Sequence, residues 1–291
     1  MYRNKYRIII PFLAPSLLLY ITFVLYPYAS AMYISLTRWK GLTKAPEFIG
    51  LENFARMLGD DNFWNALGNN GVYIVVLPVI TLGIALFFAF VLTQGVKYAK
   101  FHRVTYFFPQ VMSVVAIGVL WSFVFHPTIG FLSSLLRLLG VAEPPVWLGN
   151  PDTVIGSLSL VTIWQAVGFY MVLFIASMES VPDTYYEAAK LDGASKWHIF
   201  WNITMPLIWD TFQTAVIFIM IGSTNMFAIT QTMTGGGPSR SSEVLSTYLY
   251  GEAFLGSKFG YGTAMAVTLF FITLIISTVL TRILRRDSLE Y

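Results

Sequence analysis

Long apolar stretches alternate with short polar ones along this chain. Each apolar stretch exceeds the roughly 20 residues that one membrane-spanning helix needs. We therefore predict an all-α integral membrane protein that forms a single transmembrane domain over residues 1–291. The stretches without Asp, Glu, Lys or Arg are residues 8–37, 62–96, 104–136, 153–178, 211–239 and 259–281. Within them we expect six spanning helices, near residues 9–35, 69–93, 104–126, 154–178, 209–232 and 261–284.

The distribution of basic residues predicts the orientation of these helices. Short cytoplasmic loops of membrane proteins hold an excess of Lys and Arg. Of the 18 basic residues, eleven lie at the two termini and in the second and fourth loops. Both termini are therefore expected in the cytoplasm, which agrees with an even number of spans. The eleven residues are Arg3, Lys5, Arg7, Lys97, Lys100, Arg103, Lys190, Lys196, Arg282, Arg285 and Arg286.

Composition supports the membrane class, since 56% of the residues are apolar and only 11% are charged, against about 25% in soluble proteins. The net charge of +3 reflects the excess of Lys and Arg in the cytoplasmic segments, and it gives no indication of nucleic-acid binding. The sequence Ala29-Ser30-Ala31 is compatible with a signal-peptidase site. However, the first apolar run is much longer than the roughly 7–15 residues of a signal peptide core, so we expect a retained helix.

A charged segment, residues 180–206, separates the fourth and fifth spans. Pro182 suits a helix start, and Thr184 with Glu187 fits a capping box. We expect a first helix from Thr184 to Leu191. Ala188 and Ala189 keep one surface of it small, so that another backbone can approach closely.

A second short helix is expected to follow in the same segment. Gly193 can adopt the left-handed conformation that ends a helix, and the second helix then covers Lys196–Trp201. Pro206 is expected to redirect the chain into the fifth span. The orientation predicted above places both short helices in the cytoplasm. Helix chemistry alone leaves another interpretation open, in which Trp197 and its aromatic neighbours rest among lipid headgroups.

The residues of this segment resemble the "EAA" loop of permeases from binding-protein-dependent ATP-binding-cassette importers, in the version that carbohydrate permeases carry. Other matches lie in the first and last outer loops, in and just after the third span, and in the fourth span, so the resemblance covers nearly the whole chain. The loop matches are Glu187, Ala188, Ala189, Asp192, Gly193, Ala194, Ser195, Trp197, Phe200, Trp201, Ile203, Thr204, Pro206 and Leu207. The others are Gly50–Phe54, Trp121, Pro127, Gly130, Trp164, Gln165, Thr234–Pro238, Tyr250, Ala253 and Phe254.

The resemblance implies a passive half-pore in a prokaryotic inner or plasma membrane, driven by other subunits. The implied partners are a second, homologous permease, two cytosolic ATPase subunits that bind ATP and Mg, an extracytoplasmic solute-binding protein and a carbohydrate. The loop helix is expected to dock on an ATPase. The expected coupling residues are Glu187, Ala188, Ala189, Lys190, Asp192, Gly193, Ala194, Ser195 and Pro206.

The outer loop that contains Gly235, Gly236, Gly237 and Pro238 is the one that faces the binding protein in this family. Turn formation alone also explains these residues, because glycine and proline are turn formers. Both interpretations stay open at this stage.

Catalytic machinery is not expected in this chain. A phosphate-binding P-loop requires a Gly-Lys pair, and the sequence contains none, nor any cysteine. His102, His126 and His198 do not have metal-ligand spacing. We predict a subunit that is not an enzyme, with no catalytic residue, no metal and no cofactor of its own.

Polar and aromatic residues within the spans are candidates for a substrate path. A neutral sugar needs hydrogen-bond partners for its hydroxyls and flat apolar surfaces for its ring. The candidates are Trp121, Gln165, Phe169, Tyr170, Ser223, Thr224, Asn225, Phe227 and Gln231. For each residue alone, ordinary packing between spanning helices is the competing interpretation.

Three other functional classes compete with this interpretation. A proton-coupled carrier would be expected to carry acidic relay residues within its spans, and the six predicted spans have none away from their ends. A sodium-coupled carrier that uses backbone carbonyls stays open. An intramembrane enzyme lacks a candidate catalytic group. A permease of the same superfamily for a non-sugar solute, such as a metal or an amino acid, is the nearest competitor.

Overall fold

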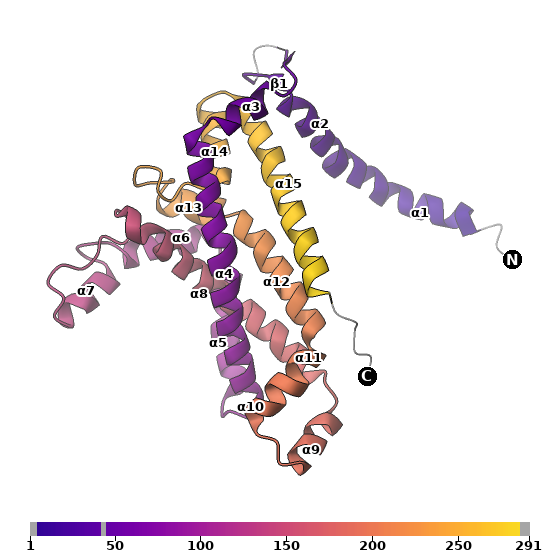
Figure 1. Cartoon of the computed structure of the whole chain (residues 1–291), viewed down its shortest axis with the longest axis vertical. Helices are drawn as coiled ribbons and strands as arrows, with labels where there is room; N and C mark the ends of the chain where they lie inside the picture. The colour runs from indigo at the N-terminus through magenta and orange to yellow at the C-terminus, as the bar shows by residue number, and fades with distance from the viewer. Residues whose placement is uncertain (1–4, 42–44, 286–291) are drawn as a thin grey trace. The chain divides into compact units, whose positions relative to one another are not determined.

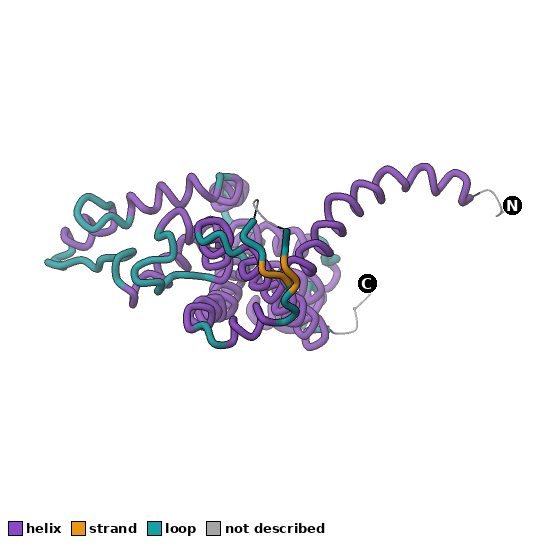
Figure 2. The backbone as a smooth tube through the Cα atoms, turned by 90° about the horizontal axis from the view of Figure 1, so that it is seen from above, coloured by secondary structure: helices purple, strands orange, loops and turns teal. Residues whose placement is uncertain are grey.

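The computed structural model describes residues 5–41 and 45–285, and these residues are mostly helical (Figures 1 and 2). Arg3 and Arg286, which enter the charge distribution above, lie outside the described residues. The first helices and strands are α1 Lys5–Tyr20, α2 Tyr26–Ser35, β1 Thr37–Arg38, β2 Glu47–Phe48, α3 Glu52–Leu58, α4 Asp61–Thr93, α5 Ala99–Val111 and α6 Val114–Val124. The remaining helices are α7 Phe131–Leu138, α8 Pro151–Glu179, α9 Asp183–Leu191, α10 Lys196–Ile199, α11 Met205–Leu207, α12 Trp209–Thr224, α13 Phe227–Met233, α14 Leu245–Tyr250 and α15 Phe259–Leu284.

Four helical segments of the described chain are long and apolar enough to cross a membrane. They are Ile9–Ser35, Asp61–Thr93, Pro151–Glu179 and Phe259–Leu284. Two bent helix pairs, α5 with α6 and α10–α11 with α12, bring the number to six if each pair is one span. The chain is thus a mostly helical membrane protein. Each predicted span overlaps one of these segments, but the fifth, residues 209–232, overlaps its bent pair only over 209–224 and continues into α13.

The residues form two compact units, of which the first comprises residues 1–63 and 248–271. In it, α1 and α2 continue through a π-helical turn, Ile21–Leu25, as one curved helix (Figure 1). The strands β1 and β2 pair antiparallel, with Thr37 opposite Phe48. The buried side-chain amide of Asn53 donates to the main-chain oxygens of Ser35 and Thr37, at 2.9 Å each. This amide therefore fixes α3 against the end of the first span.

The second unit comprises residues 64–247 and 272–291 and has two apolar clusters. The first includes Met171, Phe174 and Ile175 of α8 with Ile219 of α12. The second cluster contains the largest buried side chain of α4, Tyr73. It also includes Leu77, Ile117, Val154, Leu158 and Ile229. Helices α4 and α8 both contribute to the two clusters, so these two helices connect them.

Close contact between α5 and α8 depends on a glycine. A Cβ atom added to Gly168 of α8 would lie 1.9 Å from the main-chain oxygen of Tyr106 in α5. No side chain fits at that distance. The backbones of the two helices therefore touch directly at this point.

The third predicted span, residues 104–126, is broken. Helix α5 ends at Val111 and α6 begins at Val114, with a bend of 100° between them. Pro109 removes one N–H donor from the last turn of α5, and Met112 and Ser113 adopt extended conformations. Both sides of the break are apolar, so hydrophobicity alone predicts a continuous helix.

The fifth predicted span, residues 209–232, is also interrupted. Helix α12 ends at Thr224, Asn225 leaves the helical conformation with φ −111° and ψ 67°, and α13 begins at Phe227. At its other end, the chain turns by 74° at Ile208 and not at Pro206. Pro206 lies within α11, which directly continues the preceding helical turns.

Candidate functional site

Helix α9 begins the polar segment between the fourth and fifth spans. It starts at Asp183, one residue earlier than predicted, with Pro182 before it in an extended conformation. No side chain caps this end, so the capping box predicted for Thr184 and Glu187 is absent. The carboxylate of Asp183 lies in the first turn instead, where it interacts favourably with the helix dipole.

The C-terminal end of α9 has the geometry that Gly193 predicts. Gly193 has φ +74°, and the N–H of Ala194 bonds to the oxygen of Ala189 at 3.0 Å. The N–H of Gly193 bonds to the oxygen of Lys190 at 3.1 Å. These two bonds form a Schellman motif, which depends on a residue that tolerates positive φ. Ser195 then caps α10 by accepting from the N–H of His198 at 3.2 Å.

Aromatic packing attaches the second short helix to the end of α4. The rings of Phe200 and Phe90 lie 4.9 Å apart, and Trp197 stacks on Phe200 at 5.9 Å. Phe200 is 5% exposed, whereas Trp197 and Trp201 are 60% and 49% exposed. The helix is longer than predicted, because a π-helical turn, Phe200–Thr204, extends it into α11. The contact with Phe90 is a feature that the sequence did not reveal.

The predicted coupling residues divide between two faces of α9. Ala189 is buried within the chain, so it does not belong to an exposed small-residue surface. Glu187, Ala188 and Lys190 are exposed, and Leu191 is 89% exposed. Asp192, Gly193 and Ser195 are exposed as well, and Ala194 and Pro206 are half-buried. The segment therefore has one packed face and one open face.

A cavity of about 230 Å³ lies in the second unit between α4, α6, α8, α12 and α13. It brings together four of the predicted path residues, namely Gln165, Tyr170, Ser223 and Asn225. Asn225 occupies the break between α12 and α13, so the interruption of the fifth span forms part of the cavity wall. No charged residue lines this cavity among the described residues.

Five predicted path residues lie outside this cavity. Trp121 lines a separate groove of about 1150 Å³ between α4, α5 and α8, where its ring lies 5.4 Å from that of Trp164. Phe169 packs edge to face on Tyr170 at 5.1 Å. Thr224 is buried and donates to the oxygen of Ile221 at 2.7 Å. Phe227 and Gln231 lie on α13, with Gln231 exposed.

Sequence reasoning missed several residues of the cavity. Thr81 of α4 and Thr162 of α8 contribute hydroxyl groups, and Leu77, Val114 and Met226 contribute apolar surface. A single threonine is a weak signal within a long apolar stretch such as the second predicted span. The positions of the helices, and not the residue types, identify these side chains.

The glycine-rich outer loop folds back on itself. The hydroxyls of Thr234 and Ser242 lie 2.8 Å apart, and the N–H of Ser242 bonds to the oxygen of Gly236 at 3.3 Å. Gly235 is exposed, Gly236 is buried, and Gly237 and Pro238 are half-buried. Turn formation thus explains these residues structurally, and Gly235 is the one of the four that is open to contact.

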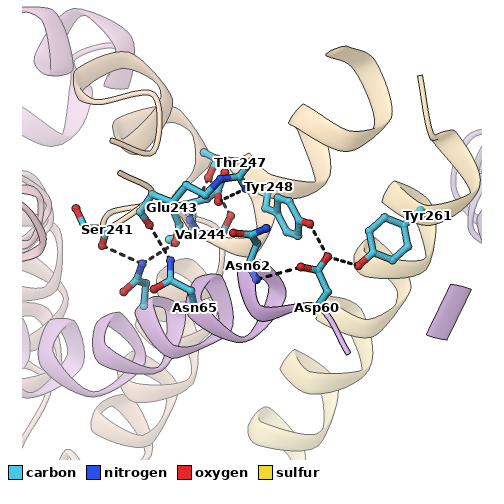
Figure 3. A network of polar contacts seen from close by, with 11 residues as sticks. Asp60, Asn62, Asn65, Ser241, Glu243, Val244, Thr247, Tyr248 and Tyr261 are labelled. Atoms are coloured by element: carbon cyan, nitrogen blue, oxygen red, sulfur yellow. Dashed lines mark hydrogen bonds and ion pairs between the residues drawn. The ribbon is translucent and has the colours of Figure 1, made fainter. Parts of the chain in front are cut away.

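Asparagines near the start of α4 hold the chain that follows this loop (Figure 3). The amide of Asn65 donates to the oxygen of Arg240 at 2.8 Å. Asn69 donates to the oxygens of Ser241 and Glu243, at 3.0 and 2.8 Å. The sequence Asn69-Asn70 in an apolar helix was a usable signal, since buried amides require partners.

A carboxylate in the first unit joins two tyrosines (Figure 3). Asp60 accepts hydrogen bonds from the hydroxyls of Tyr248 and Tyr261, the latter at 2.6 Å. Burial alone raises the pKa of Asp60, but these hydroxyls and the N–H groups of Asn62 and Phe63 outweigh it, so the pKa lies below its ordinary value of 3.8. The guanidinium of Arg56 lies 4.3 Å from the ring centre of Tyr261.

Metal-binding geometry is absent from residues 5–41 and 45–285, where no cluster of three or more His, Cys, Asp or Glu residues occurs. The three histidines lie apart on α5, after α6 and on α10. His126 instead accepts from the N–H of Thr128 at 3.3 Å in its own loop.

Comparison with known proteins identifies the family. Residues 74–287 match the family described as "binding-protein-dependent transport system inner membrane component". The diacetylchitobiose uptake system permease protein NgcF of Streptomyces coelicolor is 35% identical, over 94% of this chain and 80% of its own. The probable starch degradation products transport system permease protein AmyD of Thermoanaerobacterium thermosulfurigenes is 30% identical, over 96% of this chain and 94% of its own.

Relatives with other named substrates and a solved structure also match. The sn-glycerol-3-phosphate transport system permease protein UgpA of Agrobacterium fabrum is 29% identical, over 91% of each chain. A chain in the crystal structure of a bacterial ABC transporter that imports the acidic polysaccharide alginate has the same fold. It has a TM-score of 0.86 and 18% identity, and 98% of each chain is covered. The chain therefore belongs to the binding-protein-dependent inner membrane component family, and it is a multi-pass permease subunit of an ABC importer.

Proposed function

We propose that this permease forms half of a pore that imports a neutral sugar or oligosaccharide, delivered by a solute-binding protein and driven by ATP hydrolysis in partner subunits. The observation that carries the substrate class is the cavity between α4, α6, α8, α12 and α13. Gln165, Ser223 and Asn225 supply donors and acceptors, and Tyr170 supplies an aromatic surface. A sugar ring requires both kinds of surface.

The charge of the cavity favours a neutral substrate. Phosphate and carboxylate groups in proteins are usually held by Arg or Lys. The described lining of the cavity includes neither residue. An anionic solute such as glycerol phosphate is therefore the second candidate, supported by a relative's name and not by the chemistry of this cavity.

Coupling is assigned to the exposed face of α9. The Schellman motif and the aromatic contact with Phe90 hold α9 and α10 as rigid elements, which is what transmission of a domain movement requires. Glu187, Ala188 and Leu191 form an open surface that an ATPase subunit with a complementary cleft can cover. ATP and Mg are bound by those partners, and a second permease completes the pore.

Transport follows an alternating-access scheme in this proposal. The loaded binding protein and ATP hold the outward-open form, and hydrolysis restores the inward-open form. A ligand shifts such an equilibrium only by its difference in affinity for the two forms. The binding protein must therefore bind the outward-open form more tightly.

Reconstitution tests this function directly. We expect proteoliposomes that contain this chain, its partner permease and the ATPases to import maltose, cellobiose or diacetylchitobiose when binding protein is outside and ATP inside. Import of glycerol phosphate but of none of these sugars would contradict the substrate class. Import driven by an ion gradient without ATP would contradict the mechanism and indicate a secondary carrier.

Orientation has its own test, because the chain contains no cysteine. Single variants Ser195→Cys and Gly235→Cys place one thiol in the coupling segment and one in the outer loop. We expect a membrane-impermeant maleimide added to intact cells to label Gly235→Cys and to label Ser195→Cys only after the membrane is opened. The reverse pattern would overturn the proposed topology.

A further inference from the structure

Thr81 of α4 has a buried hydroxyl group without a hydrogen-bond partner. The residue is 1% exposed, and its Oγ1 bonds to no group in the described chain. A buried hydroxyl that lacks a partner carries a cost of about 1–3 kcal/mol. Such groups are uncommon in folded proteins, and each calls for an explanation, such as a functional role or a bound water.

Neighbouring hydroxyls show that the helical position does not force this arrangement. In spanning helices, Ser and Thr commonly bond to the carbonyl one turn earlier. Thr93 bonds to the oxygen of Ala89 at 3.0 Å, in the same helix as Thr81. Thr162 bonds to the oxygen of Leu158 at 3.0 Å, and Ser223 to that of Ile219 at 2.7 Å. Of the Ser and Thr residues that line this cavity in the described chain, Thr81 is the one whose hydroxyl has no partner.

The cavity that Thr81 lines has the size of a small polar ligand. Its volume of about 230 Å³ lies below the roughly 300–1,000 Å³ of pockets for drug-sized ligands. It corresponds to the share of about eight water molecules in the liquid, at roughly 30 Å³ each. A single sugar ring is on this scale, and an oligosaccharide is not.

We propose that Thr81 is a specificity-determining residue, whose hydroxyl binds one hydroxyl of a sugar ring held in this cavity. The inference rests on the proposed function, since it requires a sugar in the membrane. A threonine hydroxyl can donate to and accept from a sugar hydroxyl. Gln165 of α8 and Asn225 at the end of α12 line the same cavity, so the ring is held by groups from three elements. An oligosaccharide then passes one ring at a time.

The variant that tests this hydrogen bond is Thr81→Val, which replaces the hydroxyl by a methyl group of similar size. Thr81→Ser restores the hydroxyl. Thr230→Val is the control, because Thr230 is fully buried and its hydroxyl also lacks a partner, yet it does not line the cavity. Each variant is reconstituted in the full complex. The probe is whichever of maltose, cellobiose and diacetylchitobiose the wild-type complex imports fastest.

The measured quantity is the number of sugars imported per ATP hydrolysed, with loaded binding protein at saturation. We expect Thr81→Val to lower it about 2- to 10-fold, the factor that one neutral hydrogen bond supplies. Thr81→Ser and Thr230→Val should keep the wild-type ratio, and binding-protein-stimulated ATP hydrolysis should be unchanged in all three. This ratio separates substrate binding from a merely structural role, which would lower import and hydrolysis together.

The outcomes separate this inference from the proposed function. If wild-type complexes import a sugar and Thr81→Val imports it with the wild-type ratio, the role of Thr81 is wrong while the function stands. An equal loss in Thr81→Val and Thr230→Val would also overturn it. If the wild type imports none of the three sugars, both the proposed substrate class and this inference fail.

Discussion

The side-chain amide of Asn70 in α4 donates to the main-chain oxygen of Thr224, the last residue of α12, across 3.1 Å. Its carbonyl oxygen accepts the N–H of Leu245 at 2.8 Å. Asn70 is 1% exposed. One buried side chain thus joins the break beside the cavity to the start of α14, just after the glycine-rich loop.

Removal of this side chain should destabilise the protein. Asn70→Ala leaves an N–H and a carbonyl without a partner, at a cost of about 1–3 kcal/mol for each. We expect a lower Tm in detergent and reduced uptake. Asn62→Ala is the control, since Asn62 is an exposed asparagine near the start of the same helix. Equal Tm values for the two variants would contradict the bridging role.

Removal of polar side chains that line the cavity should slow transport, and removal of a polar side chain outside the cavity should not. We expect Gln165→Ala and Asn225→Ala to lower the import rate about 2- to 10-fold, as loss of one neutral hydrogen bond predicts. Gln231→Ala serves as the control, because Gln231 is an exposed amide outside the cavity. The affinity of the binding protein for its sugar should stay constant throughout. Wild-type import in the first two variants would favour ordinary helix packing.

Charge reversal on the open face of α9 should uncouple the subunits. Glu187 is exposed, so Glu187→Lys should leave the fold of the chain intact. We expect uptake to be lost and binding-protein-stimulated ATP hydrolysis to fall. Glu143→Lys introduces the same charge change at an exposed residue of the loop between α7 and α8 and should have little effect. Unchanged uptake in Glu187→Lys would remove Glu187 from the coupling surface.

The left-handed conformation of Gly193 predicts a second coupling variant. A non-glycine residue in this conformation costs about 1–2 kcal/mol, so Gly193→Asp should disturb the Schellman motif and the angle between α9 and α10. We expect loss of uptake while the chain still inserts into the membrane. Gly140, with φ +90° after α7, carries the same strain when replaced. We expect Gly140→Asp to keep more uptake than Gly193→Asp. Equal uptake in the two variants would contradict a specific role of Gly193 in coupling.

The carboxylate of Asp60 predicts an acid-dependent loss of stability. Burial raises its pKa, but the hydroxyls of Tyr248 and Tyr261 with two N–H groups bring the net value below 3.8. The unfolded chain therefore binds this proton at a higher pH than the folded chain does. The stabilisation is complete above pH 3.8 and is lost as the pH falls through the lower, folded value.

Thermal unfolding in detergent measures this effect. The difference in Tm between wild type and Asp60→Asn should be constant from pH 7 to about 5 and should shrink below pH 3.8. Asp152→Asn is the control, since Asp152 is an exposed carboxylate at the start of α8. A difference for Asp60→Asn that does not change with pH would show that the two tyrosine bonds do not depend on the ionised carboxylate.

Hydrophobicity was sufficient to locate the long apolar helices, because a helix that crosses a bilayer needs about 20 mostly apolar residues. It was insufficient to find the breaks at Met112 and Asn225, since the chain is apolar or weakly polar on both sides. The two short helices after the fourth span were predicted from local chemistry, and Gly193 ends α9 as expected. Thr184 was assigned wrongly as a cap, because Pro182 sets the helix start one residue earlier.

The cavity was predicted only in part for a related reason. Gln165 and Asn225 are polar residues that stand out in apolar helices, so the sequence identifies them. Asn70 bonds to residues more than 80 positions away in the sequence. Thr81 is distinguished only by a buried hydroxyl without a partner. Such roles depend on which helices pack together, and no short pattern in the sequence records that arrangement.

The direct contact between the backbones at Gly168 and Tyr106 has a practical consequence for studies of the transport cycle. Helices without intervening side chains at their crossing point have little freedom to slide or rotate past each other. Spin labels on α5 and α8 should therefore keep one separation in every nucleotide state. The separation of that pair is an internal reference distance, with which distance changes across the α12–α13 break can be compared.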